Sequence, residues 1–350
     1  IGSYDTGQFL LAKREQARMY PASMTKIMTA YLAFEALESG RISLEDAVPV
    51  SEKAWRKGGS RMFLEPNTTA SVRDVLRGVV VQSGNDASIA IAEFLGGSEE
   101  AFANLMNRKA VELGMESTHF TNSSGWPDQN HYTNALDLLR LADATIRHFP
   151  DSYQFYQEKE FTYNEIRQYN RNPLLQRNHL GTDGLKTGYT KASGYGLVAS
   201  AEQNGQRFIL ILNGNKTSKE RALEARELLA WAFANFNLQH FFDQETPIAA
   251  IPVWMGQQGM VAVEAAKPVR LSIARANEAT VKVIAHHQRA VEAPITKGDV
   301  LGRVTVSAHG IDPVEVDLVA SHDVARQNFF TRLLSKLTLL SSGGARNTEF

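Results

Sequence analysis

Three short strings in this chain could together carry out the transfer of an acyl group: Ser23-Met24-Thr25-Lys26, Ser83-Gly84-Asn85 and Lys186-Thr187-Gly188. A serine hydroxyl is a weak nucleophile near neutral pH, so a base must accept its proton as it attacks a carbonyl carbon. Residues three apart on a helix share a face, so the amine of Lys26 can reach Ser23 if this stretch is helical. Pro21 suits the first turn of such a helix and Gly40 suits its C-terminal end. The first string therefore predicts a nucleophile and its base.

Each string alone is weak evidence, because serine and lysine are common on solvated helices and the other two strings often form turns or hairpin edges. All three together, in this order and each in a suitable local context, favour one shared site. Lys26 can act as a base only if its amine is uncharged for part of the time, against a reference pKa of about 10.4. Burial and a second cation both lower the pKa of a lysine, and Lys186 could be that cation. Ser83 could pass the proton to the leaving amine, and Asn85 could orient Lys26 or bind an amide of the substrate.

The third string reads as part of a strand at the edge of the cleft, with which a peptide substrate could pair. Gly188 would let the substrate backbone approach closely. The developing oxyanion needs two donors, and the backbone N–H groups of Ser23 and Tyr189 are the candidates.

Composition narrows the classes of function. The 350 residues favour two domains, and 43% hydrophobic with 21% charged residues is ordinary for a soluble globular protein. A net charge of −1 gives no overall field that would attract nucleic acid. No signal peptide and no apolar run of the ~20 residues that span a bilayer is visible, and we expect that residues have been removed ahead of Ile1. The absence of cysteine fits an oxidising envelope only weakly. The histidines, including the neighbours His286 and His287, show no metal-binding pattern, so no metal or other cofactor is expected.

Residues 1–240 mix helical and strand patterns, which predicts an α+β fold with helices against a mainly antiparallel sheet. Asn204-Gly205 between two β-rich runs indicates a hairpin, and residues 217–236 read as a long helix. Other local signals are a turn at 5–7 that leads into a strand at 8–12, a hairpin around Glu165, and helix caps at Ser71, Ser98 and Thr133.

The pattern changes after residue 245, where short alternating runs between turn residues predict a small all-β domain, a sandwich or barrel, over residues 245–323. Residues 324–340 predict an amphipathic helix, with large apolar side chains on one face: Phe329, Phe330, Leu333, Leu334, Leu337 and Leu340. Such a helix could lie at a membrane surface or pack on its own β domain. Residues 341–350 are polar and glycine-rich and are expected to be disordered.

The chain resembles the low-molecular-mass penicillin-binding proteins, the D-alanyl-D-alanine carboxypeptidases of the penicillin-binding-protein five and six group. The resemblance spans nearly the whole chain and includes the stretches 21–26, 61–64, 82–87, 118–120, 170–172 and 183–188. It implies a β-lactamase-like peptidase domain in which Ser23 forms the acyl-enzyme and Lys26 is the base. It also implies that Ser83 and Asn85 relay the proton and that Lys186 is the cation of the cleft.

The same resemblance assigns the terminal carboxylate of the substrate to Thr187 and Arg221, and it places Arg171 and Ser60 along the cleft. The residues alone favour a solvated arginine in a charged helical turn for Arg221. The implied activity is removal of the terminal D-Ala from peptidoglycan stem peptides that end in D-Ala-D-Ala, with β-lactams as covalent inhibitors. The implied place is the periplasm, at the outer face of the bacterial cytoplasmic membrane, which the helix at 324–340 would contact.

Two features depart from the family pattern, and two other functions stay open. Tyr189 stands where relatives often have histidine, and the segment 55–60 belongs to a stretch several residues shorter than in enteric relatives, which affects the rim of the cleft. A class A β-lactamase shares the first and third strings, but it needs a glutamate that activates the deacylating water. Glu165 and Asn170 have the wrong spacing for that glutamate's motif and lie too close to Lys186. A non-catalytic binding or scaffold protein would not need all three strings intact.

Overall fold

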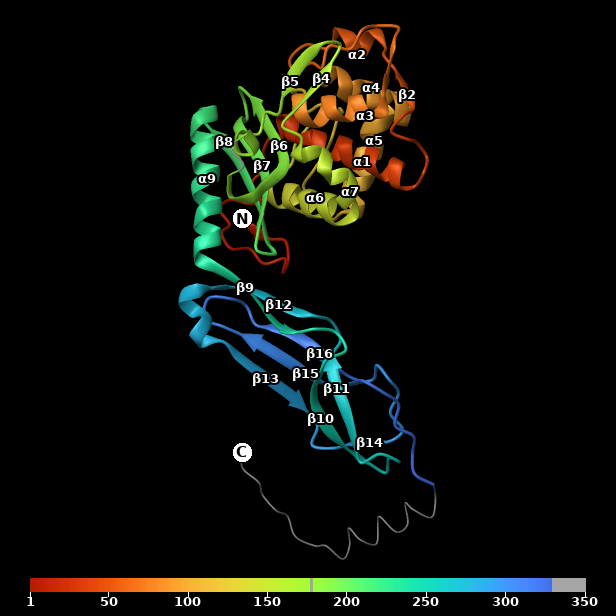
Figure 1. Ribbon diagram of the computed structural model, residues 1–350, viewed down its shortest axis with the longest axis vertical. Helices are drawn as coiled ribbons and strands as arrows, with labels where there is room; N and C mark the ends of the chain where they lie inside the picture. Colours follow the sequence, from red (N-terminus) through yellow and green to blue (C-terminus); the bar gives the residue numbers. More distant parts are fainter. Residues whose placement is uncertain (177–178, 329–350) are drawn as a thin grey trace, which may run out of the picture. The chain divides into compact units, whose positions relative to one another are not determined.

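The computed structural model describes residues 1–176 and 179–328. The chain forms two compact units, Ile1–Ala234 and a second that begins at Asn235 (Figure 1). Each unit has its own cluster of buried apolar side chains. The domains expected from the sequence are 1–240 and 245–323; residues 236–242 form a strand that pairs within the second unit.

The first unit contains a four-stranded antiparallel sheet in the order β1 (Gly2–Ser3), β8 (Gln206–Asn215), β7 (Gly194–Gln203) and β6 (Thr182–Thr190). Asn204 (φ 52°) and Gly205 (φ 73°) form the predicted hairpin turn, because a two-residue turn of this hand needs positive φ. Within the described residues β6 is paired on one side only, so it is an edge strand. The prediction of a strand at 8–12 is wrong: Phe9 makes only an isolated bridge to Gly2, since β1 is too short to extend the ladder.

Helices lie on both sides of this sheet, with α9 on one side and α1, α6 and α7 on the other (Figure 1). The helical segments are η1 (Ala22–Thr25), α1 (Lys26–Glu38), α2 (Glu52–Arg56), α3 (Val72–Arg77), η2 (Gly78–Gln82), α4 (Asn85–Gly96), α5 (Glu99–Glu112), α6 (Ala135–His148), α7 (Pro150–Tyr153), η3 (Gln154–Gln157), α8 (Pro173–Gln176), η4 (His179–Gly181) and α9 (Ser218–Asn235). Two short hairpins complete the unit, β2 (Ala47–Pro49) with β3 (Thr69–Ser71) and β4 (Glu160–Tyr163) with β5 (Ile166–Tyr169).

Local chemistry explains where these helices begin. The predicted caps Ser71 and Ser98 accept hydrogen bonds from backbone N–H groups in the first turns of α3 and α5. The cap of α6 is Asn134, not Thr133 as predicted, because the hydroxyl of Thr133 is instead hydrogen-bonded to Thr118. α1 is buried along most of its length, as an apolar core helix should be, and it places Lys26 at its first position.

The second unit is all-β, as the alternating pattern predicts. Its larger sheet has the order β13 (Lys282–His287), β15 (Val300–Ser307), β16 (Val314–Ala320), β11 (Met260–Ala265), β10 (Pro247–Trp254) and β14 (Val291–Glu292). The strands β12 (Val269–Ala274) and β9 (Phe236–Phe242) form a second sheet, and η5 (Arg275–Thr280) follows β12.

The predicted amphipathic helix is not present where its first residues are described. Val324 and Arg326 form isolated bridges with Ile295 and Gly256, which requires an extended backbone. The remaining part of that prediction, and the tail after it, lie outside the described residues. Across residues 1–176 and 179–328, no helix has both the length and the hydropathy to cross a bilayer.

Candidate active site

The serine of the first string lies in a tight turn immediately before α1. Ala22 has φ 48°, a left-handed conformation that is uncommon for a residue with a Cβ. The stretch predicted to be helical is a 3₁₀ turn through Ser23, and the α-helix begins at Lys26. Lys26 Nζ lies 3.0 Å from Ser23 Oγ, so the two groups meet as their spacing predicts.

Lys26 is fully buried and surrounded by neutral acceptors. Its Nζ donates to Asn85 Oδ1 at 2.8 Å and to the backbone carbonyl of Ser124 at 2.7 Å. Burial lowers the pKa of Lys26 to about 7; the Asp86 carboxylate opposes this shift and the charge of Arg171 adds to it. The amine therefore loses its proton near neutral pH.

Lys186 is also buried, and the pKa of its amine lies well below the usual range because of burial first and then the charge of Lys26. The cations that lower the pKa of Lys26 are Arg171 and, to a smaller extent, Lys57, so the role predicted for Lys186 stays a prediction.

The second string lies where η2 ends and α4 begins. Ser83 is buried with φ 65°, and among the described residues its hydroxyl has no hydrogen bond to Ser23 or Lys26. Asn85 donates from Nδ2 to the carbonyl of Gly58 at 2.8 Å, and its backbone N–H donates to the carbonyl of Ser60 at 2.7 Å. The segment 58–60 is therefore fastened to the second string through its backbone.

Asp86, which the sequence did not single out, fastens a second segment to α4. Its buried carboxylate accepts backbone N–H groups of Met62 at 3.0 and 3.1 Å, Phe63 at 3.0 Å and Leu64 at 3.2 Å. These hydrogen bonds therefore fix the backbone of residues 62–64 to the start of α4.

Residues 122–126 form a loop, here named the Ser124 loop, that presents its carbonyl to Lys26. The side-chain oxygen of Asn122 accepts the backbone N–H groups of Ser124, Gly125 and Trp126 at 3.2, 2.8 and 2.9 Å. Its Nδ2 donates back to the carbonyl of Trp126 at 3.0 Å. One asparagine side chain thus shapes the loop, which is a local signal that Asn122-Ser-Ser-Gly could have offered.

The Ser124 loop is also anchored to its surroundings. Thr29 Oγ1 donates to the carbonyl of Ser123 at 2.6 Å, and the buried Glu99 accepts the Ser123 hydroxyl at 2.8 Å. Gly125 has φ 77°, and a Cβ at this position would lie 1.8 Å from the carbonyl oxygen of Ala22. Only glycine allows this loop to pack against η1, the turn that carries Ser23, here named the nucleophile turn.

His131 connects the same region to the helix start. The backbone N–H of Thr121 donates to its Nδ1 at 3.1 Å, so the ring proton lies on Nε2, which donates to Thr25 Oγ1 at 2.8 Å. Burial lowers the pKa of His131 to about 4. The ring is therefore neutral near pH 7 and fixes Thr25, the residue before Lys26.

The third string lies on β6, as predicted. Lys186 and Thr187 are buried, whereas half of Tyr189 is exposed. A Cβ on Gly188 would lie 2.8 Å from the carbonyl oxygen of Pro21. The glycine is therefore required by the packing of β6 against the nucleophile turn, a reason different from the expected approach of the substrate backbone.

Arg221 extends from α9 to β7 and is buried. The solvated position that the residues alone favoured is therefore wrong. Its Nη1 contacts the carbonyl of Gly196 at 3.5 Å, and its guanidinium lies 5.8 Å from the ring centre of Tyr195. That ring stacks on Tyr189 with centroids 4.1 Å apart. Among residues 1–176 and 179–328, Arg221 Nε has no hydrogen-bond partner and no carboxylate pairs with this arginine. Gly196 is the register partner of Gly188, so the cation lies one strand from the third string.

Two further positions complete the comparison with the predictions. Arg171 is exposed, and its Nε donates to the carbonyl of Gln82 at 2.8 Å, beside the second string. Glu165 (φ 61°) is exposed in the turn between β4 and β5, the surface hairpin that its sequence predicts.

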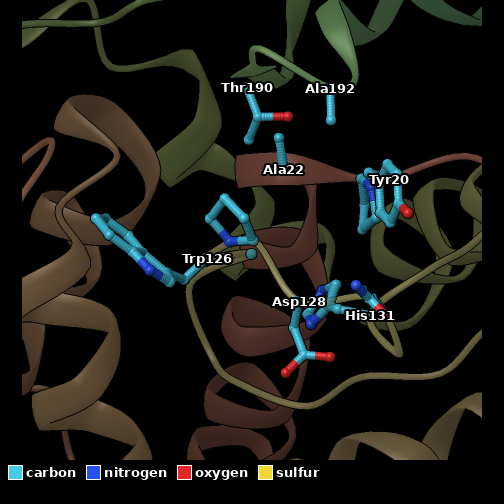
Figure 2. A pocket seen from close by; sticks show the side chains of 11 residues that line it. Tyr20, Ala22, Trp126, Asp128, His131, Thr190 and Ala192 are labelled. Atoms are coloured by element: carbon cyan, nitrogen blue, oxygen red, sulfur yellow. The ribbon is translucent and has the colours of Figure 1, made fainter.

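A cavity of about 260 Å³ adjoins the nucleophile turn (Figure 2). Ala22 and Tyr20 line it from the turn, Trp126 from the Ser124 loop, and Thr190 and Ala192 from the end of β6 and the residues after it. The sequence did not indicate this cavity, because its walls come from three distant segments.

Two family models match this chain. The family described as D-alanyl-D-alanine carboxypeptidase matches residues 1–217, and the family described as penicillin-binding protein 5, C-terminal domain, matches residues 236–326. The chain is 38% identical over 347 residues to D-alanyl-D-alanine carboxypeptidase DacA of Haemophilus influenzae, covering 97% of this chain and 88% of that protein.

Solved structures show the same similarity. Penicillin-binding protein 5 from Haemophilus influenzae superposes with a TM-score of 0.86 at 37% identity, covering 93% of this chain and 96% of that one. Penicillin-binding protein D2 from Listeria monocytogenes, in its ampicillin-bound form, has a TM-score of 0.59 at 28% identity and covers 66% of this chain and 94% of that one. These matches show that the chain belongs to peptidase family S11, the D-alanyl-D-alanine carboxypeptidases.

Proposed function

We propose that this protein removes the terminal D-Ala from peptidoglycan pentapeptide stems through an acyl-enzyme on Ser23. The observation that carries the proposal is the fully buried Lys26, whose Nζ lies 3.0 Å from Ser23 Oγ and between two neutral acceptors. An uncharged amine has two N–H groups and one lone pair. If the N–H groups donate to Asn85 Oδ1 and the Ser124 carbonyl, the lone pair faces the hydroxyl of Ser23.

Acylation follows from that arrangement. The bond from Ser23 Oγ to the carbonyl carbon forms while the hydroxyl proton moves to Lys26 Nζ. The backbone N–H groups of Ser23 and Tyr189 are the proposed donors to the oxyanion, and one such donor typically contributes about 3 to 4 kcal/mol. The proton then passes by way of Ser83 to the amine of the leaving D-Ala as the C–N bond breaks. Water subsequently hydrolyses the ester and frees Ser23.

Recognition of the substrate's end is assigned to Arg221 and Thr187. A buried guanidinium without a carboxylate partner is a strong attractor for a free carboxylate. Lys186, Arg171 and Ser60 are assigned to the same cleft. A requirement for a terminal carboxylate makes the enzyme an exopeptidase.

We also propose that β-lactams are covalent inhibitors that acylate Ser23. The ampicillin-bound structure of a relative supports this. Peptidoglycan lies outside the cytoplasmic membrane, so we place the protein in the periplasm, held at the membrane by the predicted helix within 324–340. The β-lactamase alternative is not favoured, because Glu165 is exposed in a hairpin turn rather than placed beside Ser23.

The test is to mix the protein with diacetyl-L-Lys-D-Ala-D-Ala and to measure free D-alanine by mass spectrometry, alongside covalent labelling by a fluorescent penicillin. Ser23→Ala should abolish both signals. Ser39→Ala, at the exposed C-terminal end of α1, should leave both unchanged. Labelling that persists in Ser23→Ala would overturn the assignment of the nucleophile.

A further inference from the structure

We propose that Glu99 is a positioning residue for Lys26, on which it acts through Ser123 and the backbone carbonyl of Ser124. The inference rests on the proposed function and deepens it, because it names a residue outside the three strings that sets the protonation of the base. Among the described residues, Glu99 has no hydrogen bond to Ser23 or Lys26. Its effect must therefore pass through the Ser124 loop or through its charge.

The carboxylate of Glu99 holds the residue that precedes the loop acceptor. Glu99 is the first residue of α5 and is 6% exposed. Its Oε1 accepts the hydroxyl of Ser123 at 2.8 Å and the backbone N–H of Ser123 at 3.2 Å. The carbonyl of the next residue, Ser124, accepts Lys26 Nζ at 2.7 Å. Because the two residues are adjacent in the chain, a displacement of Ser123 also displaces the acceptor of the base.

The position of this carboxylate is itself fixed from α2. Glu99 Oε2 lies 3.2 Å from Lys53 Nζ, and Lys53 also pairs with Glu100 at 2.8 Å. Both glutamates lie in the first turn of α5, where negative charge stabilises any helix. Of the two, Glu99 binds the Ser124 loop, whereas the side chain of Glu100 is 75% exposed. A comparison of these neighbours therefore separates a role in the site from a role in helix stability.

The charge of Glu99 acts on the same amine. Burial is the largest of the causes that bring the pKa of Lys26 down to about 7. The charged groups around Lys26 come from several elements: Asp86 and Glu99 raise its pKa, and Arg171 and Lys57 lower it. Lys186 on β6 is the other buried amine, and the charge of Lys26 lowers its pKa. Removing the charge of Glu99 should therefore lower the pKa of Lys26 further.

Glu99 allows charge and position to be tested separately, which Asp86 does not. The carboxylate of Asp86 accepts backbone N–H groups of residues 62–64, so any replacement there changes the backbone as well as the charge. Glu99→Gln retains an oxygen that can accept hydrogen bonds from Ser123, and it lacks the negative charge. Glu99→Ala lacks both the oxygen and the charge.

The experiment measures the rate of labelling by a fluorescent penicillin between about pH 5 and pH 9. Glu99→Gln should move the midpoint of the acid limb to lower pH and leave the plateau rate close to that of the wild type. Glu99→Ala should move the midpoint in the same direction and lower the plateau about tenfold or more, because a displaced catalytic group slows a reaction on that scale. Glu100→Gln, the matched control, should change neither the midpoint nor the plateau.

Three outcomes overturn the inference. In the first, both Glu99 variants keep the midpoint of the wild type, whatever happens to the rate, because a residue with a purely structural role lowers the rate without a shift. In the second, Glu100→Gln shifts the midpoint as far as Glu99→Gln does, which would make the effect one of charge at the start of α5. In the third, Glu99→Ala retains the full plateau rate. Circular dichroism and the melting temperature verify that each variant is folded; if Glu99→Ala is not, the midpoint of Glu99→Gln decides.

Failure of this inference is distinguishable from failure of the proposed function. If wild-type protein is labelled at Ser23 and releases D-alanine, the proposed function stands whatever the Glu99 variants show. A second measurement does not depend on activity: the NMR signal of the Lys26 ε-carbon, in protein that carries isotope-labelled lysine, is assigned with Lys26→Arg and followed against pH. It should titrate near pH 7 in the wild type and at lower pH in Glu99→Gln. Titration at the same pH in both proteins would overturn the inference.

Discussion

The neighbours of Lys26 explain why a lysine can act as a base here. A hydroxyl, an amide oxygen and a backbone carbonyl surround its amine, and all three are uncharged. A directly paired carboxylate would raise the pKa and keep the amine protonated. Among the charged groups, Asp86 raises the pKa of Lys26 most, but its carboxylate accepts hydrogen bonds from backbone N–H groups and not from Lys26. Burial therefore decides the outcome, and the pKa of Lys26 lies at about 7.

The first prediction concerns pH. Acylation by a penicillin should rise with pH and reach half its plateau near pH 7, because only the uncharged Lys26 accepts the proton of Ser23. Arg171→Gln removes a positive charge that lowers this pKa, so the midpoint should move to higher pH. Stopped-flow labelling between about pH 5 and pH 9 measures both profiles. Lys191→Gln changes a charge outside this group and should leave the midpoint in place; an unmoved midpoint in Arg171→Gln would contradict the electrostatic assignment.

At the scale of elements, the Ser124 loop connects the helical layer to the nucleophile turn. It has no regular secondary structure, and yet its position is specified from three directions by Asn122, Glu99 and Thr29. Because these contacts all lie outside the reacting groups, the loop sets the position of one carbonyl acceptor without entering the chemistry.

The second prediction tests that positioning role. Asn122→Ala removes five hydrogen bonds within the loop, so the carbonyl of Ser124 should move away from Lys26. Losing an acceptor disfavours the charged amine, so the acid limb of the pH profile should shift to lower pH while the acylation rate falls about tenfold or more. Asn122→Asp retains an oxygen for the three N–H donors and should recover part of the rate. Equal defects in both variants, with no shift in pH, would indicate a general loss of structure instead.

The third prediction uses two glycines with similar backbone angles. Gly125 (φ 77°) has the carbonyl of Ala22 within 1.8 Å of an added Cβ, whereas Gly114 (φ 69°) has open space around it. Both substitutions by alanine should cost about 1 to 2 kcal/mol of unfolding free energy for the left-handed backbone. Gly125→Ala should cost more and should also reduce penicillin labelling strongly, since the turn that holds Ser23 must move. Chemical denaturation and labelling measure the two effects; similar behaviour of both variants would argue against the close contact.

Local signals in the sequence predicted much of this, and the failures have physical causes. Ser71, Ser98 and Asn204-Gly205 act through their immediate neighbours, so their caps and turn could be predicted. The role of the Ser124 carbonyl could not be predicted, because every residue type has the same backbone carbonyl. Thr133 failed as a cap because a distant threonine competes for its hydroxyl.

At the scale of the whole molecule, every group assigned to the chemistry comes from the first unit, and each unit has its own buried core. The fourth prediction is therefore that a fragment ending at Asn235, after α9, folds and is acylated by penicillin at the rate of the full chain. A cooperative melting transition and labelling kinetics test this, with Ser23→Ala in the fragment as the control. A fragment that melts without cooperativity would show that the second unit is needed for folding.

The buried guanidinium of Arg221 has a consequence for the course of the reaction. In the recognition proposed above, Arg221 binds the carboxylate of the substrate, and the freed D-alanine retains that same group, so the product should compete with new stems for Arg221. Trimming should therefore be subject to product inhibition, and it should slow wherever free D-alanine accumulates faster than it diffuses away. An amide of D-alanine, which lacks the negative charge, should not have this effect.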